Sequence, residues 1–398
     1  MAQNTQGNPS TDSGFVKSLG LFDATTIVTG GMIGSGIFIV SADIARQTNS
    51  PGLMLLTWII TALLTITAAL SYGELAAMMP QAGGQYVYLR EAFNPLVGFL
   101  YGFTFFFVIQ TGTIAAVAVA FAKFCGVFFP WVAADNFLLP FLTTQQLTGI
   151  GVVVLLTWVN SRGVKAGSIV QNVFTVAKVA ALLLLVILGL LLGRNETAVA
   201  ANFTNFWANA DWGWTTVKLV GVAMVGSLFS SDSWNNITFA AGEMKNPRRD
   251  LPLSLLLGVG LVSVLYLASN VVYLNVLPLE AIKNAPQDRV GTAVVAAFLG
   301  IGAEKWMAAA IMISTFGCVN GLVLSGARVY YAMAKDKLFF RLCAEIDPKS
   351  KTPVKSLWVQ CLWASALTLT GRYNDSVSYT HLRAHETKAN LVCRLLLE

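Results

Sequence analysis

Two short segments of the chain combine residues that could bind a small zwitterion inside a membrane. The first, residues 30–38, is a glycine-rich run with four glycines in its first seven positions. The second, residues 229–238, is rich in hydroxyl and amide side chains and includes the carboxyl group of Asp232. Each lies in the middle of a long apolar stretch, where unpaired polar groups cost several kcal/mol. Both segments are therefore candidates for a polar, cavity-lining site.

The glycine-rich run predicts a break in the first apolar segment, because so many glycines make a poor helix. We expect one helix to stop near Met32 and another to restart at Ile37. The amides of Ser35, Gly36 and Ile37 would then stand at a new helix N-terminus, which attracts a carboxylate through its N–H groups and dipole. Glycines alone are equally compatible with close helix packing through small residues.

The run at residues 229–238 favours a binding site over close helix packing. The end of the helix before it presents carbonyl groups, which suit an ammonium group. Two interrupted segments, the first and the sixth along the chain, are the pattern of an inverted-repeat transporter with its site near the bilayer midplane. The expected substrate-binding residues are Met32, Ile33, Gly34, Ser35, Gly36, Phe229, Ser230, Ser231, Asp232 and Ser233.

Lys178 lies about ten residues into the fifth apolar segment, near the expected bilayer centre. A lysine this deep is costly unless carbonyls or hydroxyls surround its ammonium group. Three roles are open to it: a fixed cation in place of a bridging sodium ion, a proton carrier with a depressed pKa, or a static tie between helices.

The elements that must position these residues are membrane helices. The chain has 398 residues, of which 55% are hydrophobic and 12% charged, whereas soluble domains carry about 25% charged residues. Its apolar segments predict an all-α polytopic membrane protein with about nine spans. They are residues 19–46, 52–79, 96–124, 146–160, 168–193, 215–240, 252–277, 302–330 and 356–371.

Charge and cysteine usage narrow the class of protein further. The five cysteines lack metal-ligand spacing, and the net charge of +6 does not suggest nucleic-acid binding. With the N-terminus in the cytoplasm, lysines and arginines concentrate on the cytoplasmic side, as the positive-inside rule requires. Residues 1–14 are polar and read as a disordered cytoplasmic tail. We expect no metal, no cofactor and no enzymatic activity, since no nucleophile–base pair accompanies the polar residues.

At these residues the chain resembles the amino acid–polyamine–organocation (APC) superfamily, nearest to bacterial permeases and exchangers similar to L-amino-acid transporters. The match covers about residues 15–370. It is carried by residues 34–38, 72–75, 80–88, 174–178, 229–236, 242–249 and 317–321.

The resemblance implies a five-plus-five inverted repeat (the LeuT-type fold) that works by alternating access. The first repeat would cover about residues 19–193, and the second would start at about 215. The amides of Ser35 and Gly36 would bind a carboxylate. The carbonyls of Met32 and Phe229, with Asp232, would receive an ammonium group, and the Phe229 ring would act as a gate. A further set would tie the helices around a built-in cation: Lys178, Gly31, Ser314 and Thr315.

One departure from the family affects the expected specificity. Ser231 and Ser233 stand where relatives often carry an aromatic residue and a glycine. A smaller residue at 231 could enlarge or polarise the pocket for the substrate side chain.

The implied function is sodium-independent exchange or facilitated permeation of neutral L-amino acids across a bacterial inner membrane. The alternatives are proton-coupled symport of amino acids or polyamines, with Lys178 or Asp232 as the proton carrier, and a non-transporting amino-acid sensor. The expected partners are the small substrate and the lipid bilayer. The sequence names no accessory subunit.

The end of the chain departs from this pattern from about Asn374. Residues 378–394 are too charged to span a bilayer, and the i, i+4 spacing of His381 and His385 is not interpreted as a metal site. The segment resembles adapter-derived read-through at the end of a translated fragment. We therefore expect residues 15–372 to form the transporter domain, C-terminally incomplete because its second repeat is truncated, and residues 373–398 to be non-native.

Overall fold

The first apolar segment forms two helices rather than one, and the rest of the bundle is assembled around their junction. The structure is a computed structural model and describes residues 15–140, 142–300 and 302–370. The first part of the chain forms α1 (Leu21–Met32), α2 (Gly36–Thr48), α3 (Pro51–Met78), α4 (Gln85–Ala92), α5 (Pro95–Thr104), a π-helical turn η1 (Phe105–Gln110) and α6 (Thr111–Cys125).

The remaining elements continue the helical pattern. They are α7 (Thr144–Ser161), α8 (Val164–Leu192), α9 (Glu196–Phe203), α10 (Trp214–Ser230), α11 (Asn236–Phe239), η2 (Ala241–Glu243), α12 (Pro247–Val276), α13 (Leu279–Lys283), η3 (Pro286–Asp288), α14 (Val290–Leu299), α15 (Ala303–Lys335), η4 (Arg341–Ala344) and α16 (Val354–Thr370). A small antiparallel hairpin, β1 (Phe137–Leu139) and β2 (Leu142–Thr143), follows α6.

Each of the nine apolar segments predicted from the sequence corresponds to one long helix, a bent helix or a broken pair of helices. By length and composition, five helices in the described part of the chain can each cross a membrane, and the bent pair α1–α2 makes six. The stretches between these segments also contain regular structure, namely the β1–β2 hairpin and the short helices α9, α13 and α14. The predicted tails, residues 1–14 and 373–398 with His381 and His385, lie outside the described residues.

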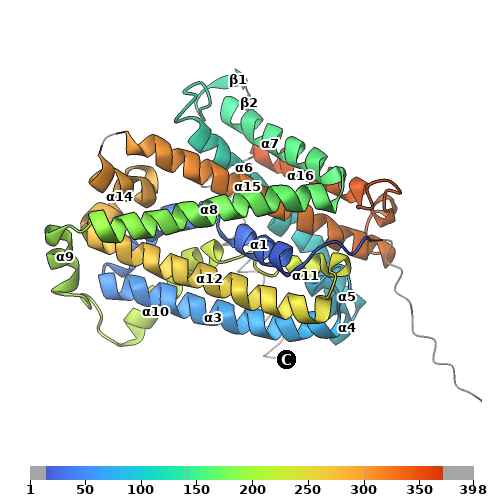
Figure 1. Ribbon diagram of the computed structural model, residues 1–398, viewed down its shortest axis with the longest axis horizontal. Coiled ribbons are helices and arrows are strands. Elements are labelled where there is room, and N and C mark those ends of the chain that lie inside the picture. The colour runs from blue at the N-terminus through green and yellow to red at the C-terminus, as the bar shows by residue number, and fades with distance from the viewer. Residues whose placement is uncertain (1–14, 141, 301, 371–398) are drawn as a thin grey trace, which may run out of the picture.

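The long helices run side by side (Figure 1), with α3, α8 and α12 on the face toward the viewer. At the left are α9 and α14, and at the right α4 and α5. The start of α1 lies toward the right, so we call that end the N-terminal end of the bundle and the left one the opposite end. The order of elements repeats, because the broken pairs α1–α2 and α10–α11 are each followed by a long helix, α3 and α12.

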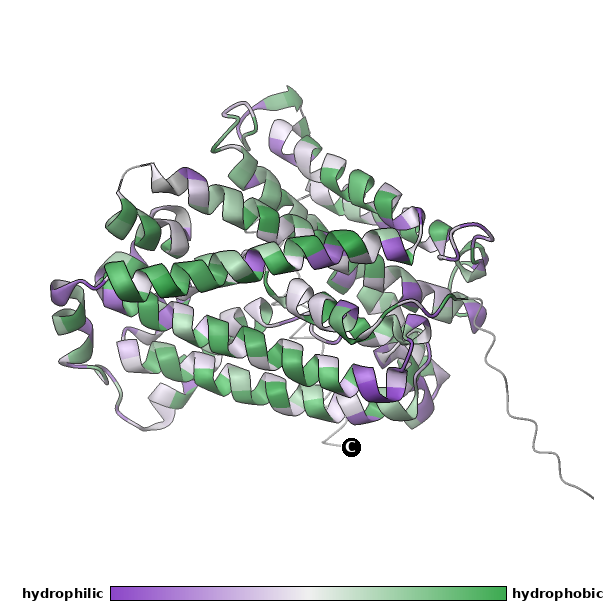
Figure 2. Cartoon of the chain, in the orientation of Figure 1, coloured by the Kyte–Doolittle hydropathy of each residue, from purple (hydrophilic) through white to green (hydrophobic). Residues whose placement is uncertain are grey.

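The polarity of the bundle suits a lipid solvent. Large apolar side chains point outward from the long helices, among them Leu63, Leu191 and Val264, and Figure 2 shows apolar residues over most of α3 and α8. The interior instead holds polar groups such as Gln171, Lys178 and many hydroxyls. A bundle that exposes apolar and buries polar side chains is an integral membrane protein.

Arg328 is one of the arginines that the positive-inside rule assigns to the cytoplasmic side, but its charge is buried. Arg328 lies within α15 and is 1% exposed, as is Glu243, and the guanidinium Nη2 lies 3.0 Å from a carboxylate oxygen of Glu243. The Arg328 Nε donates to the same oxygen at 3.1 Å. This buried ion pair ties α15 to the turn η2 after the second break.

Candidate functional site

The first break lies where the glycine-rich run predicts it. Helix α1 ends at Met32 and α2 begins at Gly36, one residue earlier than expected, with a bend of 41° between the two. Ser35 is the N-cap residue of α2, so the amides that follow it stand at a helix N-terminus. Gly30 and Gly31, in contrast, are still inside α1.

The second break follows α10. Helix α10 ends at Ser230 and α11 begins at Asn236, and the Ser233 carbonyl accepts from the Asn236 amide at 3.2 Å. Ser233 has a φ of +70°, a left-handed conformation that L-residues other than Asn and Asp rarely adopt. This conformation gives a physical reason for the glycine that the resemblance places at position 233. The serine accepts backbone strain there, on the order of 1–3 kcal/mol.

The two breaks are in direct contact, and glycines make the contact close. A Cβ added at Gly36 would lie 2.9 Å from the Cβ of Ser230, and one at Gly31 would lie 3.2 Å from the carbonyl oxygen of Ser233. Both interpretations of the glycine-rich run therefore hold: Gly34 lies in a helix break, whereas Gly31 and Gly36 allow close packing.

A tyrosine that the sequence analysis missed joins the two breaks. The hydroxyl of Tyr266, on α12, lies 3.0 Å from both the Met32 and the Ser230 carbonyl oxygens. The Met32 carbonyl, expected to receive the substrate ammonium group, thus already accepts a hydrogen bond. The Phe229 carbonyl accepts from the Asp232 amide at 3.1 Å. A buried tyrosine hydroxyl in an apolar helix was the available signal, because it must find a partner.

A cavity of about 30 Å³ lies between the breaks. That volume holds a water molecule or two but no amino acid, so the site is contracted in this structure. The predicted residues that line it are Gly31, Met32, Gly34, Ser35, Gly36, Phe229, Ser230, Asp232 and Ser233, and the sequence analysis missed Thr113, Val117 and Cys318. Ile33 and Ser231 do not line it, so the residue expected to shape the side-chain pocket is buried beside it.

Asp232 differs from the rest of the second break because it is solvent-exposed. Near it lies a cluster of aromatic rings, in which Tyr72 packs edge-on against Trp234 at 5.0 Å and against Tyr88 at 6.0 Å between ring centroids. The carboxyl group therefore stands where the contracted cavity meets a more open region. Phe229, the expected gate, lines the cavity and is half-buried.

Lys178 lies next to the first break. Its Nζ donates to the carbonyl oxygens of Gly30 at 2.5 Å, Ile33 at 2.7 Å and Ser314 at 3.2 Å. The side chain is 2% exposed, and its three donors match three acceptors. These carbonyls belong to the end of α1 and to α15, so the ammonium group crosslinks α8, α1 and α15.

The other members of the predicted tie take different positions. The Ser314 hydroxyl lies 3.0 Å from the Ile33 and 3.1 Å from the Gly34 carbonyl oxygens. Thr315 instead bonds back to the Ile311 carbonyl of its own helix at 2.8 Å. The thiol of Cys318, which was not predicted, lies 3.2 Å from the Gly31 carbonyl oxygen. In the described part of the chain, no group of three or more metal-ligating side chains comes together.

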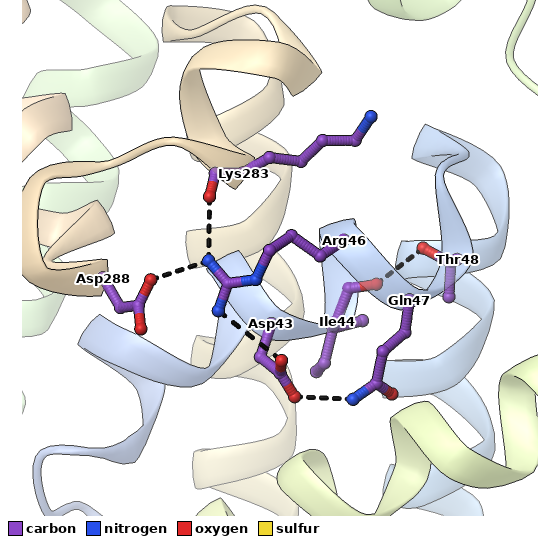
Figure 3. A network of polar contacts seen from close by, with 7 residues as sticks. All are labelled: Asp43, Ile44, Arg46, Gln47, Thr48, Lys283 and Asp288. Carbon is purple, nitrogen blue, oxygen red and sulfur yellow. Dashed lines mark hydrogen bonds and ion pairs between the residues drawn. The ribbon is translucent and has the colours of Figure 1, made fainter. Parts of the chain in front are cut away.

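Charged side chains join α2 to the segment that follows α12 (Figure 3). Arg46 donates from Nη1 to the Asp288 carboxylate at 2.7 Å and to the Lys283 carbonyl at 2.8 Å. Its Nη2 lies 3.5 Å from Asp43, which also accepts from Gln47 at 2.6 Å. We call Arg46, Asp43, Lys283 and Asp288 the α2 ionic cluster. It ties the end of α2 to the α13–η3 segment at the opposite end of the bundle.

Comparison with known proteins places the chain among transporters. A family model described as amino acid permease matches residues 19–385. The b(0,+)-type amino acid transporter 1 of Mus musculus is 28% identical over 368 residues, which are 91% of this chain and 72% of that protein. Large neutral amino acids transporter small subunit 2 of Homo sapiens is 29% identical, covering 91% of this chain and 66% of that protein. Asc-type amino acid transporter 1 of Homo sapiens is 29% identical over 372 residues.

Proposed function

Because this chain belongs to the amino acid permease family, we propose that it moves neutral L-amino acids across a membrane by sodium-independent exchange. This family membership confirms the resemblance seen in the sequence. The observation that carries the proposal is the meeting of two helix breaks at one small cavity, deep in an apolar bundle.

The two breaks offer complementary chemistry to an amino acid. The start of α2 presents the amides after Ser35, which suit the substrate carboxylate. The end of α10 presents carbonyls, and the carboxyl group of Asp232 lies beside them. A substrate ammonium group would bind on that side. We propose that binding displaces part of the Tyr266 bridge, since its hydroxyl occupies the Met32 and Ser230 carbonyls in the contracted site.

Lys178 supports independence from sodium. The carbonyls of an unwound helix end are the ligands that a coupling ion would use in a transporter of this architecture. Here a covalently attached ammonium group already bonds to two carbonyls at the end of α1, those of Gly30 and Ile33, and to the Ser314 carbonyl of α15. A sodium ion at the same place would meet like charge at close range.

We further propose that the N-terminal end of the bundle faces the cytoplasm of a bacterium. The excess of lysine and arginine at that end supports this orientation. The contracted cavity must expand toward each side in turn, and the separate halves α1 and α2 allow each side to open alone. The two-repeat division of the chain remains a prediction, as do the binding roles of individual residues.

A counterflow assay tests the function. The full chain is reconstituted in liposomes, and uptake of labelled neutral amino acids is measured with and without unlabelled amino acid inside. We expect uptake that requires internal amino acid and persists when potassium replaces sodium and when no pH gradient is present.

The same assay distinguishes the alternatives. Uptake that collapses with the proton gradient would replace exchange by proton-coupled symport. Saturable binding of an amino acid without any flux would instead identify a sensor. Liposomes of the same lipid composition without protein serve as the blank.

A further inference from the structure

A line of polar side chains runs along α8 from Lys178 toward the N-terminal end of the bundle. Thr175 lies four residues after Gln171 and three after Asn172, and Lys178 lies three after Thr175, so these residues lie along one side of the helix. We call them the α8 polar stripe. The stripe faces α1, and every member makes a hydrogen bond to that helix.

The deep part of the stripe holds the α1 backbone. The Thr26 carbonyl oxygen lies 3.1 Å from the Thr175 hydroxyl and 3.4 Å from the Gln171 amide nitrogen. Gln171 and Thr175 are 0% and 2% exposed. Gly30 permits this approach, since a Cβ there would clash with both side chains. The second interpretation of the glycine run, close packing, therefore applies to Gly30 as well.

The orientation of the Gln171 side-chain amide is fixed by a hydrogen bond from α15. Asn320, on α15, donates to the Gln171 Oε1 at 3.0 Å and to the Gly167 carbonyl at 3.0 Å. With its oxygen engaged, the Gln171 amide must turn its NH₂ group toward α1. Asn160 donates to Asn320 at 2.9 Å, so α7 and α15 both brace the stripe.

The shallow part of the stripe holds α1 by side chains. Asn172 donates to the Asp23 carboxylate at 2.7 Å, and the Thr26 hydroxyl bonds to the Asn172 amide oxygen. Asn172 and Asp23 are only half-buried. The other Asp23 oxygen accepts from the Gly20 amide at 3.0 Å, which caps α1. This end of the contact is therefore the part that water can reach first.

We propose that Gln171 and Asn172 are positioning residues that hold α1 against α8 and so keep the N-terminal side of the binding site closed. Release begins at the wetter Asn172–Asp23 pair and proceeds toward Lys178. Each bond shifts an equilibrium by only about three- to tenfold, so α1 is held firmly by several bonds yet leaves reversibly. The inference rests on the proposed function for its purpose, but the contact itself can be tested without transport.

An acid–amide exchange across the contact is the sharpest test. In Asn172→Asp two carboxylates face each other and repel. In the double variant Asp23→Asn with Asn172→Asp, the amide and the acid trade places. The amide introduced at position 23 can then donate to the carboxylate introduced at position 172, while the Thr26 hydroxyl still has a carboxylate oxygen to bond. The control is Ser168→Ala, on the same helix, whose hydroxyl bonds within α8 to the Lys165 carbonyl at 3.1 Å.

The primary measurement is hydrogen–deuterium exchange in nanodiscs at pH 8 without substrate. We expect amides of residues 24–32 to exchange about tenfold faster in Asn172→Asp and those of α2 to be unchanged. The exchange rates of the double variant should return to within about twofold of the wild-type rates. Those of Ser168→Ala should equal the wild-type rates. A double variant that exchanges as fast as Asn172→Asp would overturn the proposal, as would unchanged exchange in the single variant.

Transport kinetics give a second readout. Asn172→Leu, which keeps the branched shape and the number of heavy atoms but loses both bonds, should lower the apparent KM for substrate on the N-terminal side about threefold. The apparent KM on the opposite side should rise by a similar factor. A loss of maximal rate with both KM values unchanged would indicate a merely structural role and would contradict us. If the wild type shows no flux at all, the proposed function fails and the exchange experiment still decides the contact.

Discussion

The two halves of the broken first segment differ in how they are held away from the site. The far end of α2 is fastened by the α2 ionic cluster, in which the Arg46 and Asp288 side chains are 40% and 44% exposed, although Ser41 nearer the site also makes a buried hydrogen bond of 2.8 Å to Asn270. Helix α1 is fastened by the α8 polar stripe, whose deep members are buried and bond to carbonyls or amides. The far end of α2 is thus held by exposed charges, and α1 by buried dipoles and one enclosed ammonium group.

This difference has a physical consequence for gating. Exposed ion pairs contribute little each, about 0–1 kcal/mol, and salt screens them. Buried hydrogen bonds are insensitive to salt, and their loss leaves costly unpaired groups. The α2 side should therefore open readily and respond to the solution, whereas the α1 side should open less often and respond to the protein sequence.

Lys178→Ala should produce the largest effect, because it removes the ammonium group that crosslinks α8, α1 and α15. It leaves the carbonyls of Gly30, Ile33 and Ser314 without their donor. Each hydrogen bond to a charged group contributes about 1.5–3 kcal/mol, and three are lost at once, so we expect transport to fall at least about 100-fold in the counterflow assay.

The matched control for this change is Lys165→Ala, on the same helix but exposed at its N-terminal end. It should transport at the wild-type rate. Wild-type exchange by Lys178→Ala would refute the role given to the buried ammonium group, provided that both variants elute as folded monodisperse protein.

Gly36→Ala should have a smaller but still large effect, on the α2 side of the comparison. The added methyl would meet Ser230 at the junction of the two breaks and push α2 away from the site. Overpacking of this kind costs about 1–3 kcal/mol, so we expect the apparent KM for the amino acid to rise about tenfold or more.

Two further variants test whether the contact causes that loss. Gly221→Ala, on α10 with nothing within 4 Å of its added Cβ, should behave as the wild type. Ser230→Gly in the Gly36→Ala background removes the two closest atoms, the Ser230 Oγ and Cβ, and should recover most of the affinity. If the double variant is as weak as Gly36→Ala, the two breaks do not act through this contact.

Arg46→Gln should have the smallest effect, because it breaks only exposed charge pairs in the α2 ionic cluster. Uptake from the opposite end at low substrate concentration should change about two- to threefold. Raising potassium chloride from 0.1 M to 1 M shortens the screening length from about 10 Å to about 3 Å. High salt should therefore change uptake by the wild type by the same factor, and it should leave uptake by Arg46→Gln unchanged.

The control for this prediction is Arg194→Gln. Its ion pair with Glu196 at 2.9 Å lies within one exposed loop and joins no moving parts. An equal salt response in Arg46→Gln and the wild type would show that the ionic cluster does not govern opening on that side.

Much of this arrangement could be predicted from the sequence because helix breaks have strong local signals. The glycine cluster placed the first break within one residue of its observed position, and the run of hydroxyl and amide residues placed the second within residues 229–238. Lys178 was evident because a buried charge in lipid is rare. These signals depend on residues close together in the chain.

The contacts between distant segments could not be predicted in the same way. Tyr266 and Cys318 each bring one polar atom whose partner is a backbone carbonyl far away in the chain, and neither disturbs a periodic pattern. The sequence shows the spacing of Gln171 and Thr175, but not that their partner is the Thr26 carbonyl. A backbone acceptor carries no sequence signal, so the occupied Met32 carbonyl and the contracted cavity required the three-dimensional structure.

The charge of Lys178 has a consequence for energy supply. Because this cation is part of the chain, it stays in the membrane through every cycle and is never released with the cargo. Exchange of one zwitterion for another then carries no net charge across the bilayer. A membrane voltage performs about 2.3 kcal/mol of work per charge moved for each 100 mV. Because no net charge moves in this exchange, the voltage would do no work on it. The direction of net movement would be set by the concentration ratios of the amino acids alone.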